Sequence, residues 1–356
     1  MSAPEPAPTL AMAVPPSSIN HAAADATNPA GPYMYRSVLP VPRRWFRPRS
    51  ADAFRAMETR PSDVVISSLP KGGTTWMHRV LCCLLHEIDD GGNAMEETAF
   101  SAVRRAQPYP DGIPVDDEEM ELALSGSREV MPHDPTIFGE KCTLQDLIDQ
   151  PEPRLFSTHL FGEDYLPLCL LGAGEGGAGK GRLIVVLRNL KDTLTSLHHF
   201  MGVAKDDWHG NEYGPGSLAR FLDPDSPNAY GSSFSWIEAQ DRVVRKMQKE
   251  EGRSRVLVVY FERMKEDLPS ELDRIAGFLG LGPLTDAKRQ AVAEACGFKA
   301  MKEGGGGFSR GKSHLRSGKV GDWRNHMDED SWKRLDAAFD ERLGSVGIAQ
   351  PLREYH

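Results

Sequence analysis

Short apolar runs alternate with longer helical stretches along this chain, and this alternation constrains the fold more than any other feature. The runs are rich in Val, Ile and Leu and too short for buried helices, so they predict buried β-strands. They lie at residues 64–69, 154–157, 182–187 and 255–260. Helices are predicted at residues 76–86, 191–201, 233–250 and 270–279. Alternating strands and helices imply an α/β fold in which helices cover both faces of a parallel sheet.

Composition narrows the class of protein. The chain has 356 residues, of which 40% are hydrophobic and 26% charged, as is typical of a globular protein. Its net charge of −9 argues against nonspecific binding to nucleic acids or anionic membranes, because proteins that bind polyanions carry basic surfaces. No apolar run approaches the ~20 residues that a membrane span requires. We therefore expect neither a nucleic acid nor a membrane as partner.

The first thirty residues differ in composition from the rest. Residues 1–30 are rich in Ala, Pro and Ser, and they lack the apolar core of a signal peptide. They contain Glu5 and Asp25 but no Arg, which fits poorly with an organelle transit peptide. Residues 1–30 are predicted to be a disordered extension, and residues 31–356 a single domain.

The cysteines indicate a reducing compartment. The chain has five of them, at Cys82, Cys83, Cys142, Cys169 and Cys296. An odd number without CxxC spacing predicts reduced thiols in a cytoplasmic protein, rather than a disulfide framework or a zinc site. His198 and His199 are adjacent, which does not place both on one helix face, and no Cys or carboxylate cluster completes a shell. No metal site is expected.

A phosphate-binding loop is predicted at residues 70–76, PKGGTTW, between the first strand and its helix. A phosphate needs backbone N–H groups that converge on it, and a helix N-terminus supplies them with a favourable dipole. Glycines let the backbone approach closely, while Thr hydroxyls and a Lys ammonium add donors and charge. An ordinary glycine turn is the alternative, and the strand-loop-helix context argues against it.

A second segment competes for this role and fails on context. Residues 174–181, GEGGAGKG, nearly match the GxxxxGK[ST] pattern, but Gly181 stands where Ser or Thr should hold magnesium. A strand follows this segment rather than a helix, so no helix N-terminus would face the phosphate. We interpret it as a mobile surface loop.

The loop PKGGTTW resembles the PKSGTTW loop of the cytosolic sulfotransferase family, particularly its plant-type members. Members have a P-loop-like fold, a three-layer sandwich with a central parallel sheet flanked by helices. In that family the loop holds 3′-phosphoadenosine 5′-phosphosulfate (PAPS), the sulfonate donor, which is a co-substrate used without a metal. The resemblance implies that Lys71 contacts the bridging oxygen and Trp76 the adenine. It assigns the whole loop to the donor: Lys71, Gly72, Gly73, Thr74, Thr75 and Trp76.

Two further segments resemble family motifs in the same order along the chain. Residues 154–160, RLFSTHL, resemble the plant-type RLFxTHLP segment, whose His is the catalytic base, which implies this role for His159. Phe161 replaces the Pro of that motif. Residues 187–200 resemble RNPKDxxVSxxHF, which implies that Arg188 and Ser196 bind the 3′-phosphate.

Two more matches lie near the C-terminus. Residues 297–301, GFKAM, resemble the SFxxM segment near adenine, which implies a donor contact for Phe298. Residues 316–323, RSGKVGDW, resemble RKGxxGDW, whose RKG part grips the 3′-phosphate. The corresponding residues here are Arg316, Ser317 and Gly318. Five matches in order are far more specific than any one, and together they cover residues 46–356 in outline.

The chain also departs from the family pattern. The family's YED tract is FER at residues 261–263, so Phe261 keeps the ring of a Tyr near adenine and loses its hydroxyl. Ser317 stands where the family has Lys, which removes a cation from the 3′-phosphate site. Gly72 replaces a small polar residue, at the cost of one side-chain hydrogen bond.

The animal-type dimer motif KxxxTVxxxE is interrupted in this chain. It would fall on residues 324–333, where Asp328, Glu329 and Lys333 break it. We therefore expect a monomer, and a dimer would need another interface.

The chemistry of sulfonate transfer fits two of these residues. An alcohol or phenol is a poor nucleophile while protonated, so a base within hydrogen-bond reach assists it, and His suits this near neutral pH. His159 follows a predicted strand, at the edge where open α/β sheets place ligands. Charge that builds on the leaving oxygen needs a cation in place, which Lys71 supplies.

Other interpretations of single residues stay open. A lone His is usually structural, and Arg188, Ser196 or Arg316 could be solvated or could cap a helix. Phe261 and Phe298 could equally belong to the core.

The sequence thus predicts transfer of a sulfonate group from PAPS to a hydroxyl of a small-molecule acceptor. A P-loop NTP-dependent kinase and a non-catalytic nucleotide-binding protein are the alternatives. The acceptor is not readable, because its pocket would be lined by loops at residues 108–134 and 203–231.

Overall fold

A computed structural model describes most of the chain beyond residue 45. The described residues are 33–35, 39–41, 46–98, 100–101, 104, 107, 109–125, 142–172, 180–204, 232–249, 254–303 and 315–355. The predicted disordered extension at residues 1–30 lies outside them. So do residues 173–179 of the glycine-rich segment, residues 126–134 and 205–231 of the predicted acceptor loops, and the glycines at 304–307.

The predicted α/β architecture is confirmed. The strands are β1 (Tyr33–Tyr35), β2 (Leu39–Val41), β3 (Val64–Ser68), β4 (Leu155–Thr158), β5 (Arg182–Leu187) and β6 (Val256–Tyr260). Four of them form one parallel sheet in the order β4-β3-β5-β6, and β1 and β2 form a separate antiparallel pair. The four predicted apolar runs are the four strands of the parallel sheet.

Helices fill the stretches between these strands and make up the chain after β6. They are α1 (Pro48–Ala56), α2 (Thr74–Cys82), η2 (Cys83–Glu87), α4 (Asp117–Ser125), α6 (Leu144–Ile148), α7 (Gly162–Tyr165), α8 (Leu190–Ala204), α10 (Ser233–Gln248), α11 (Phe261–Glu266), α12 (Leu268–Leu279), α13 (Asp286–Ala295), α14 (Phe298–Glu303), η3 (Asp322–Asn325), α15 (Glu329–Leu343) and η4 (Gly347–Tyr355). Helix α2 begins two residues before the prediction, because Gly73 adopts a left-handed conformation and turns the chain into the helix at Thr74.

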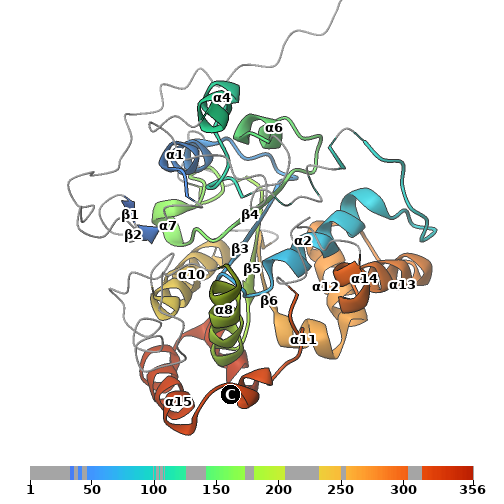
Figure 1. Cartoon of the computed structure of the whole chain (residues 1–356). Helices are drawn as coiled ribbons and strands as arrows, with labels where there is room; N and C mark the ends of the chain where they lie inside the picture. The colour runs from blue at the N-terminus through green and yellow to red at the C-terminus, as the bar shows by residue number, and fades with distance from the viewer. Residues whose placement is uncertain are drawn as a thin grey trace, which may run out of the picture.

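Each face of the sheet packs against its own apolar cluster, which makes three layers. On β3, Val65 belongs to one cluster, while Val64 and Ile66 belong to the other, as the alternation of strand side chains requires. The first cluster includes α1, α7, α10 and α15, and the second includes α2, α12 and α13. In Figure 1, α2, α12 and α13 accordingly lie on the opposite side of the sheet from α1, α7 and α10.

Several helices start with a side-chain cap that the sequence supplies. Asp267 accepts a hydrogen bond from the backbone N–H of Ser270 at the start of α12, and Gly280 ends that helix in the left-handed conformation. Asp328, one of the residues that interrupt the dimer motif, caps α15 by accepting from the N–H of Ser331. Such caps satisfy backbone donors that a helix leaves unpaired.

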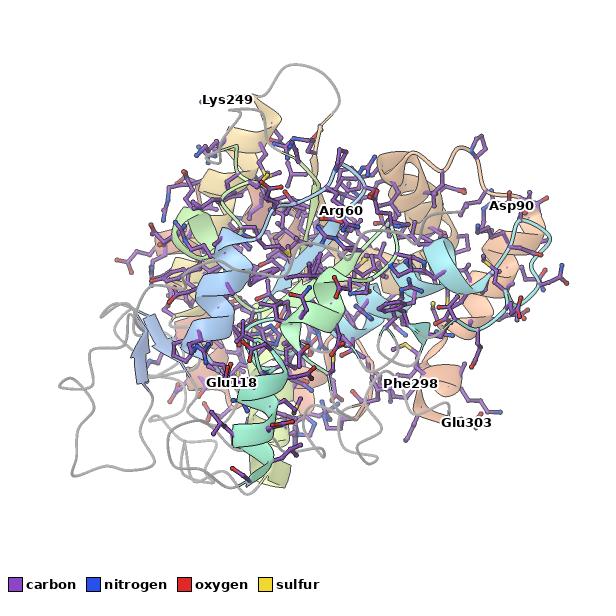
Figure 2. The ribbon with its side chains drawn as sticks, turned by 90° about the horizontal axis from the view of Figure 1, so that it is seen from above. Arg60, Asp90, Glu118, Lys249, Phe298 and Glu303 are labelled. Carbon is purple, nitrogen blue, oxygen red and sulfur yellow. The ribbon has the colours of Figure 1, made fainter. Side chains whose placement is uncertain are left out.

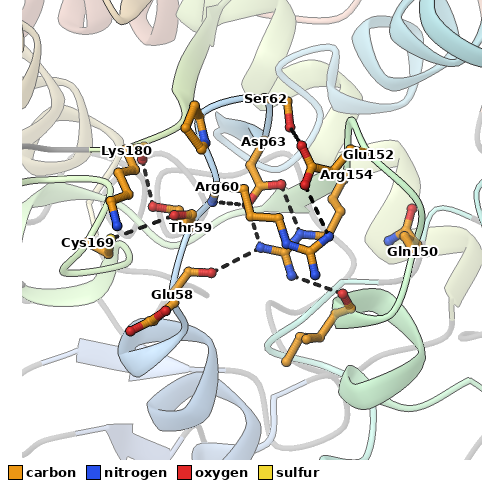
Figure 3. A network of polar contacts seen from close by, with 12 residues as sticks. Glu58, Thr59, Arg60, Ser62, Asp63, Gln150, Glu152, Arg154, Cys169 and Lys180 are labelled. Carbon is orange, nitrogen blue, oxygen red and sulfur yellow. Dashed lines mark hydrogen bonds and ion pairs between the residues drawn. The ribbon is translucent and has the colours of Figure 1, made fainter. Parts of the chain in front are cut away.

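A buried ion pair holds the strand entries in place. Both carboxylate oxygens of Asp63 accept from Arg154, at 2.9 Å from Nε and 2.6 Å from Nη2. Arg154 also donates to the carbonyl oxygens of Ile148 and Glu58. Figure 3 shows its guanidinium beside Asp63 and Glu58. The backbone of Asp63 in turn accepts from Arg182 N at 2.8 Å, so one residue couples the starts of β3, β4 and β5.

Removal of one partner should strongly destabilise the fold. Arg154→Ala leaves the Asp63 carboxylate buried and unpaired, so we expect a loss of about 3–5 kcal/mol in the free energy of unfolding by urea. Arg60→Ala is the matched control, because Arg60 pairs with Glu152 at 3.6 Å at the surface. It should cost less than about 1 kcal/mol. Equal losses in the two variants would contradict a structural role for the buried pair.

Candidate active site

The predicted site residues meet at the carboxyl edge of the parallel sheet. The strand register places Ser67 of β3 beside Thr158 of β4, and Ser68 of β3 beside Val186 of β5. The three strands therefore end at the same level. Leu187 lies beside Tyr260 at the end of β6. The loop with Lys71, then His159, Arg188 and Phe261, follows these strands directly. This is the edge at which open α/β sheets bind ligands.

The loop after β3 makes a tight turn into α2. Gly72 N donates to Leu69 O at 2.9 Å, and Lys71 is one of the non-glycine residues with positive φ, at 67°. Gly73, at φ 112°, is the N-cap of α2 and offers no side chain to its first N–H groups. These donors therefore point toward the loop without a side-chain cap, which suits an anion.

Gly72 has a steric role that the sequence did not indicate. A Cβ atom there would lie 2.9 Å from Leu69 O, closer than real Cβ contacts allow. Gly72, which stands where the family has a small polar residue, thus permits a tighter turn at residues 69–72 and also removes a hydroxyl.

His159 is held as a neutral base. Its Nδ1 lies 2.8 Å from the carbonyl oxygen of Ser68, which can only accept, so Nδ1 carries the proton and Nε2 the lone pair. Burial, with a contribution from the Lys71 ammonium, lowers the pKa of His159 to about 4. The imidazole is therefore unprotonated at neutral pH, the state that a proton acceptor needs.

Two aromatic residues that the sequence did not single out hold His159. The ring of Tyr109 lies 4.9 Å from the imidazole at 30°, and Trp236 Nε1 donates to His159 O at 3.1 Å. The hydroxyl of Tyr109 hydrogen-bonds to the side chain of Thr74, and burial raises the pKa of this phenol. Tyr109 thereby links the base to the loop. It lies in a Pro-containing stretch that carries no motif, so sequence reasoning had no signal for it.

Two cations lie side by side next to the base. Arg188 Nη1 donates to Lys71 O at 3.2 Å, and burial, together with the charge of Arg188, lowers the pKa of Lys71 to about 8. The Lys71 ammonium lies 4.5 Å from the centre of the Phe200 ring. An anion bound here would relieve the repulsion between the two cations.

Phe261 lies at the carboxyl edge of the sheet, beside Trp76 and Arg188. It belongs to neither apolar cluster, although it is buried. Its ring lies 5.2 Å from Trp76 at 69°, and the Arg188 guanidinium lies 4.4 Å from its centre. Trp76 Nε1 donates to Cys296 O at 2.9 Å. The two predicted adenine-side rings are thus brought together, next to the end of α13.

The two C-terminal motifs also meet. A Cβ on Gly318, whose φ is 59°, would lie 2.4 Å from Cδ2 of Phe298, so this backbone lies against the ring. Figure 2 shows Phe298 at the start of α14, across the molecule from Lys249. Arg188 Nη2 donates to Lys319 O at 3.5 Å, which ties residues 316–319 to the loop after β5.

Arg316 and Ser317 converge on one carboxylate. Arg316 Nη2 pairs with Oδ2 of Asp322, and Ser317 Oγ donates to the same oxygen at 3.2 Å. Burial opposes the charge of Asp322, but hydrogen bonds from Arg316 and Asn325 outweigh it and lower the pKa of this carboxyl to about 2. Asp322 lies in the matched GDW segment, and sequence reasoning assigned it no role.

The remaining predicted residues lie around these groups. Ser196 is half-buried on α8, four positions after Asp192, whose carboxylate accepts from Gly321 N at 2.7 Å and Trp323 N at 3.0 Å. Positions four apart share a helix face, so Ser196 lies on the same face of α8 as Asp192, which contacts residues 321–323. Thr75 is half-buried in the first turn of α2.

Arg188 and Arg316 each have a buried donor that could bind a ligand. Nε of Arg188 and Nε of Arg316 are buried, and neither has a hydrogen-bond partner among the described residues. Buried donors in native proteins almost always have a hydrogen-bond partner. The two unpaired Nε atoms could therefore donate to a bound anion.

The described residues contain neither a metal-ligand cluster nor a helix that could span a membrane. No group of three His, Cys, Asp or Glu side chains there could hold a metal ion. No helix in the described ranges is both long and apolar enough to cross a membrane.

The fold and the site match known proteins. In structure, the chain is similar to mouse sulfotransferase SULT7A1 complexed with PAP, with a TM-score of 0.57, 22% identity and coverage of 86% of this chain and 94% of that one. It is also similar to retinol dehydratase complexed with androsterone and PAP, with a TM-score of 0.56, 19% identity and coverage of 89% and 88%. These matches support the P-loop-like sandwich that the sequence predicted.

Sulfotransferases of animals and plants are also similar to this chain in sequence. Sulfotransferase 6B1 of Danio rerio is 26% identical over 85% of both chains. Cytosolic sulfotransferase 16 of Arabidopsis thaliana is 25% identical over 82% of this chain and 79% of its own. Animal and plant relatives are equally similar, so these matches give the plant-type assignment little support.

A family model covers most of the chain. The model described as "Sulfotransferase domain" matches residues 61–347. This span contains the five matched motifs, and it gives no support to the kinase alternative. The chain belongs to the sulfotransferase domain family, as its motifs predicted.

Proposed function

We propose that this protein transfers a sulfonate group from PAPS to a hydroxyl of a small molecule, with His159 as general base. The observation that carries the proposal is the hydrogen bond from His159 Nδ1 to the Ser68 carbonyl, beside Lys71. It presents Nε2 of a neutral imidazole next to the cation of the donor loop. Solved structures of similar fold contain PAP, adenosine 3′,5′-bisphosphate, which is the product that PAPS leaves.

The transfer follows from this arrangement. The acceptor hydroxyl gives its proton to Nε2 of His159, and its oxygen forms a bond to sulfur. The bond between sulfur and the bridging oxygen breaks, and its electron pair stays on the 5′-phosphate of PAP. Lys71 lies in the loop and stabilises this developing charge. No residue has to change its charge apart from the base.

The donor site is assigned to the converging cations and rings. The 5′-phosphosulfate would bind the loop at residues 71–75 and the start of α2. Trp76, Phe261 and Phe298 would contact adenine. Arg188, Ser196, Arg316, Ser317 and Gly318 would surround the 3′-phosphate, which the unpaired Nε atoms of both arginines support.

The acceptor would bind on the side where aromatic residues surround the base. Tyr109 and Phe200 lie next to His159 and Lys71. Such surfaces favour an apolar molecule with a hydroxyl at one end. Androsterone and retinol occupy two of the solved neighbours, which supports this class.

Two variants should separate chemistry from donor binding. We expect His159→Ala to lower turnover by about 10²–10⁴-fold and to leave PAP affinity unchanged. The loss should be smallest for acidic phenols. Lys71→Ala should weaken PAP binding and slow transfer together, because the Lys71 charge stabilises both the bound ground state and the transition state. Radiolabelled PAPS with a panel of phenols and alcohols measures turnover, and calorimetry measures affinity.

His86→Gln is the matched control for this comparison. Burial chiefly lowers the pKa of His86 to about 4 as well. His86 lies on η2, away from the loop at residues 70–76, and its Nε2 hydrogen-bonds to the carbonyl oxygen of Pro153. It should keep turnover. Normal turnover of a high-pKa alcohol by His159→Ala would show that the base lies elsewhere. Failure of the wild-type chain to label any acceptor in a single turnover would favour a non-catalytic nucleotide-binding protein.

The pH dependence of kcat/KM for PAPS should report both groups. His159 must be neutral, so activity should persist down to about pH 5 and fall as pH drops toward its pKa of about 4. Lys71 must be charged, so activity should fall as pH rises through about 8. Lys71→Arg should remove the alkaline limb, because a guanidinium stays protonated. An alkaline limb at the same pH in that variant would contradict the role of Lys71.

The contact between Gly318 and Phe298 provides a test of the donor site. Gly318→Ala places a Cβ against the ring, so it should displace Phe298 and weaken PAP binding by about tenfold or more, or about 1.4 kcal/mol. Gly282→Ala is the control, because its φ of 76° imposes the same backbone strain with nothing within 4 Å. Calorimetric titration with PAP measures the affinity of each variant. Equal PAP affinities of Gly318→Ala and Gly282→Ala would contradict a place for Phe298 in the donor site.

A further inference from the structure

Asp192, near the start of α8, holds a segment that lies far away in the chain. Its Oδ2 accepts from Gly321 N at 2.7 Å, and its Oδ1 accepts from Trp323 N at 3.0 Å, across 129 and 131 positions of sequence. Asp192 is only 2% exposed. Hydrogen bonds from backbone N–H groups to an ionised carboxylate are about twice as strong as neutral ones. Asp192 thus fixes the backbone of residues 321–323 against α8.

The helix side of this contact is tied to the sheet. Asn189 accepts at Oδ1 from the N–H groups of Lys191, at 2.9 Å, and Asp192, at 3.2 Å. Its own N–H donates to Glu262 Oε1, at 2.9 Å, just after the end of β6. Asp192 therefore lies in a first turn of α8 whose position is set by the strand ends, four positions after Arg188.

The other side of the contact leads to the residues assigned to the 3′-phosphate. Asp322 lies between the two residues whose N–H groups Asp192 holds. Its Oδ2 accepts from Arg316 Nη2 and, at 3.2 Å, from Ser317 Oγ. The Asp192 carboxylate therefore determines, through Asp322, where Arg316 and Ser317 lie relative to the loop after β5.

We propose that Asp192 sets the preference for a 3′-phosphorylated nucleotide by holding residues 316–317 in place relative to Arg188. This inference rests on the proposed donor site. Two segments far apart in the chain would meet at one phosphate, so the geometry of the site depends on the group that joins them. Asp192 uses both carboxylate oxygens on backbone N–H groups. It is thus a positioning residue, which acts through Arg316.

Charge and position predict opposite effects for the loss of this carboxylate. A phosphate monoester carries about −1.5 to −2 charges near pH 7, and a carboxylate close by repels it. Asp192 is close enough to Arg188 for its charge to oppose the fall in the Arg188 pKa that burial causes. By charge alone, Asp192→Asn would therefore strengthen PAP binding. By position it weakens PAP binding, because the amide NH₂ group would face one of the two backbone N–H groups.

Calorimetric titration with PAP and with AMP measures this effect, because AMP shares the adenine and the 5′-phosphate but lacks the 3′-phosphate. We expect Asp192→Asn to lower PAP affinity by about tenfold and AMP affinity by less than about threefold. Asp192→Glu keeps the charge but misplaces it, so it should have the same effect. Equal fractional losses for PAP and AMP, or tighter binding of PAP by Asp192→Asn, would overturn the inference.

Asp241→Asn is the control for a general loosening of the fold. Asp241 is also buried, and its Oδ1 accepts from Ile348 N at 3.1 Å, so the substitution breaks an equivalent bond between α10 and η4. It should lower the free energy of unfolding but keep the ratio of PAP to AMP affinity. A ratio that falls as far in Asp241→Asn as in Asp192→Asn would also overturn the inference.

A double-variant cycle tests the route through Arg316. The losses of PAP affinity in Asp192→Asn and Arg316→Ala should fall short of additivity by about threefold or more, because both act on one group. Additive losses would contradict this route.

Hydrogen exchange of the wild-type chain tests the contact without any variant. The amides of Gly321 and Trp323 should be protected, and rapid exchange of both would overturn the inference. PAP that binds the wild-type chain no more tightly than AMP would instead overturn the assignment of Arg188 and Arg316, and the inference with it.

Discussion

The pairing of β3 with strands on both sides is the constraint on which the site depends. β3 is hydrogen-bonded in parallel to β4 and β5, so the three strands end at the same level. Parallel order sends each following segment over one edge of the sheet. The carbonyl of Ser68, the last residue of β3, then lies within hydrogen-bond distance of His159. A shift of one register would separate the base from the donor loop.

Charge is concentrated in a small part of an acidic chain. Lys71 and Arg188 lie side by side, and two nearby carboxylates bond to the backbone of the neighbouring segments. Asp192 orders the segment at residues 321–323, and Glu262 accepts from Asn189 N at 2.9 Å. Burial raises the pKa of Glu262 to about 7, so part of this negative charge is suppressed next to the site. A net charge of −9 therefore coexists with a local anion site.

The sequence predicted the sheet and much of the site, for physical reasons. Strands buried on both faces are continuous apolar runs, so all four were visible, with boundaries correct to within one residue. Lys71, His159, Arg188 and Phe261 were predictable because each directly follows a strand within a motif. Helices α1, α13 and α15 were missed, since tertiary packing defines them more than apolar patterning does. Helices α13 and α15 also begin at side-chain caps, Thr285 and Asp328. Tyr109 could not be found, because it contacts Thr74 and His159, which lie far from it in the chain.

The bond from Trp76 Nε1 to the carbonyl of Cys296 spans 220 positions of sequence. During synthesis the donor loop thus emerges long before the backbone against which its tryptophan rests. Contacts of such large sequence separation form slowly, since a long chain must close on itself first. A truncated or partly folded chain would therefore present residues 70–76 without the backbone that anchors Trp76.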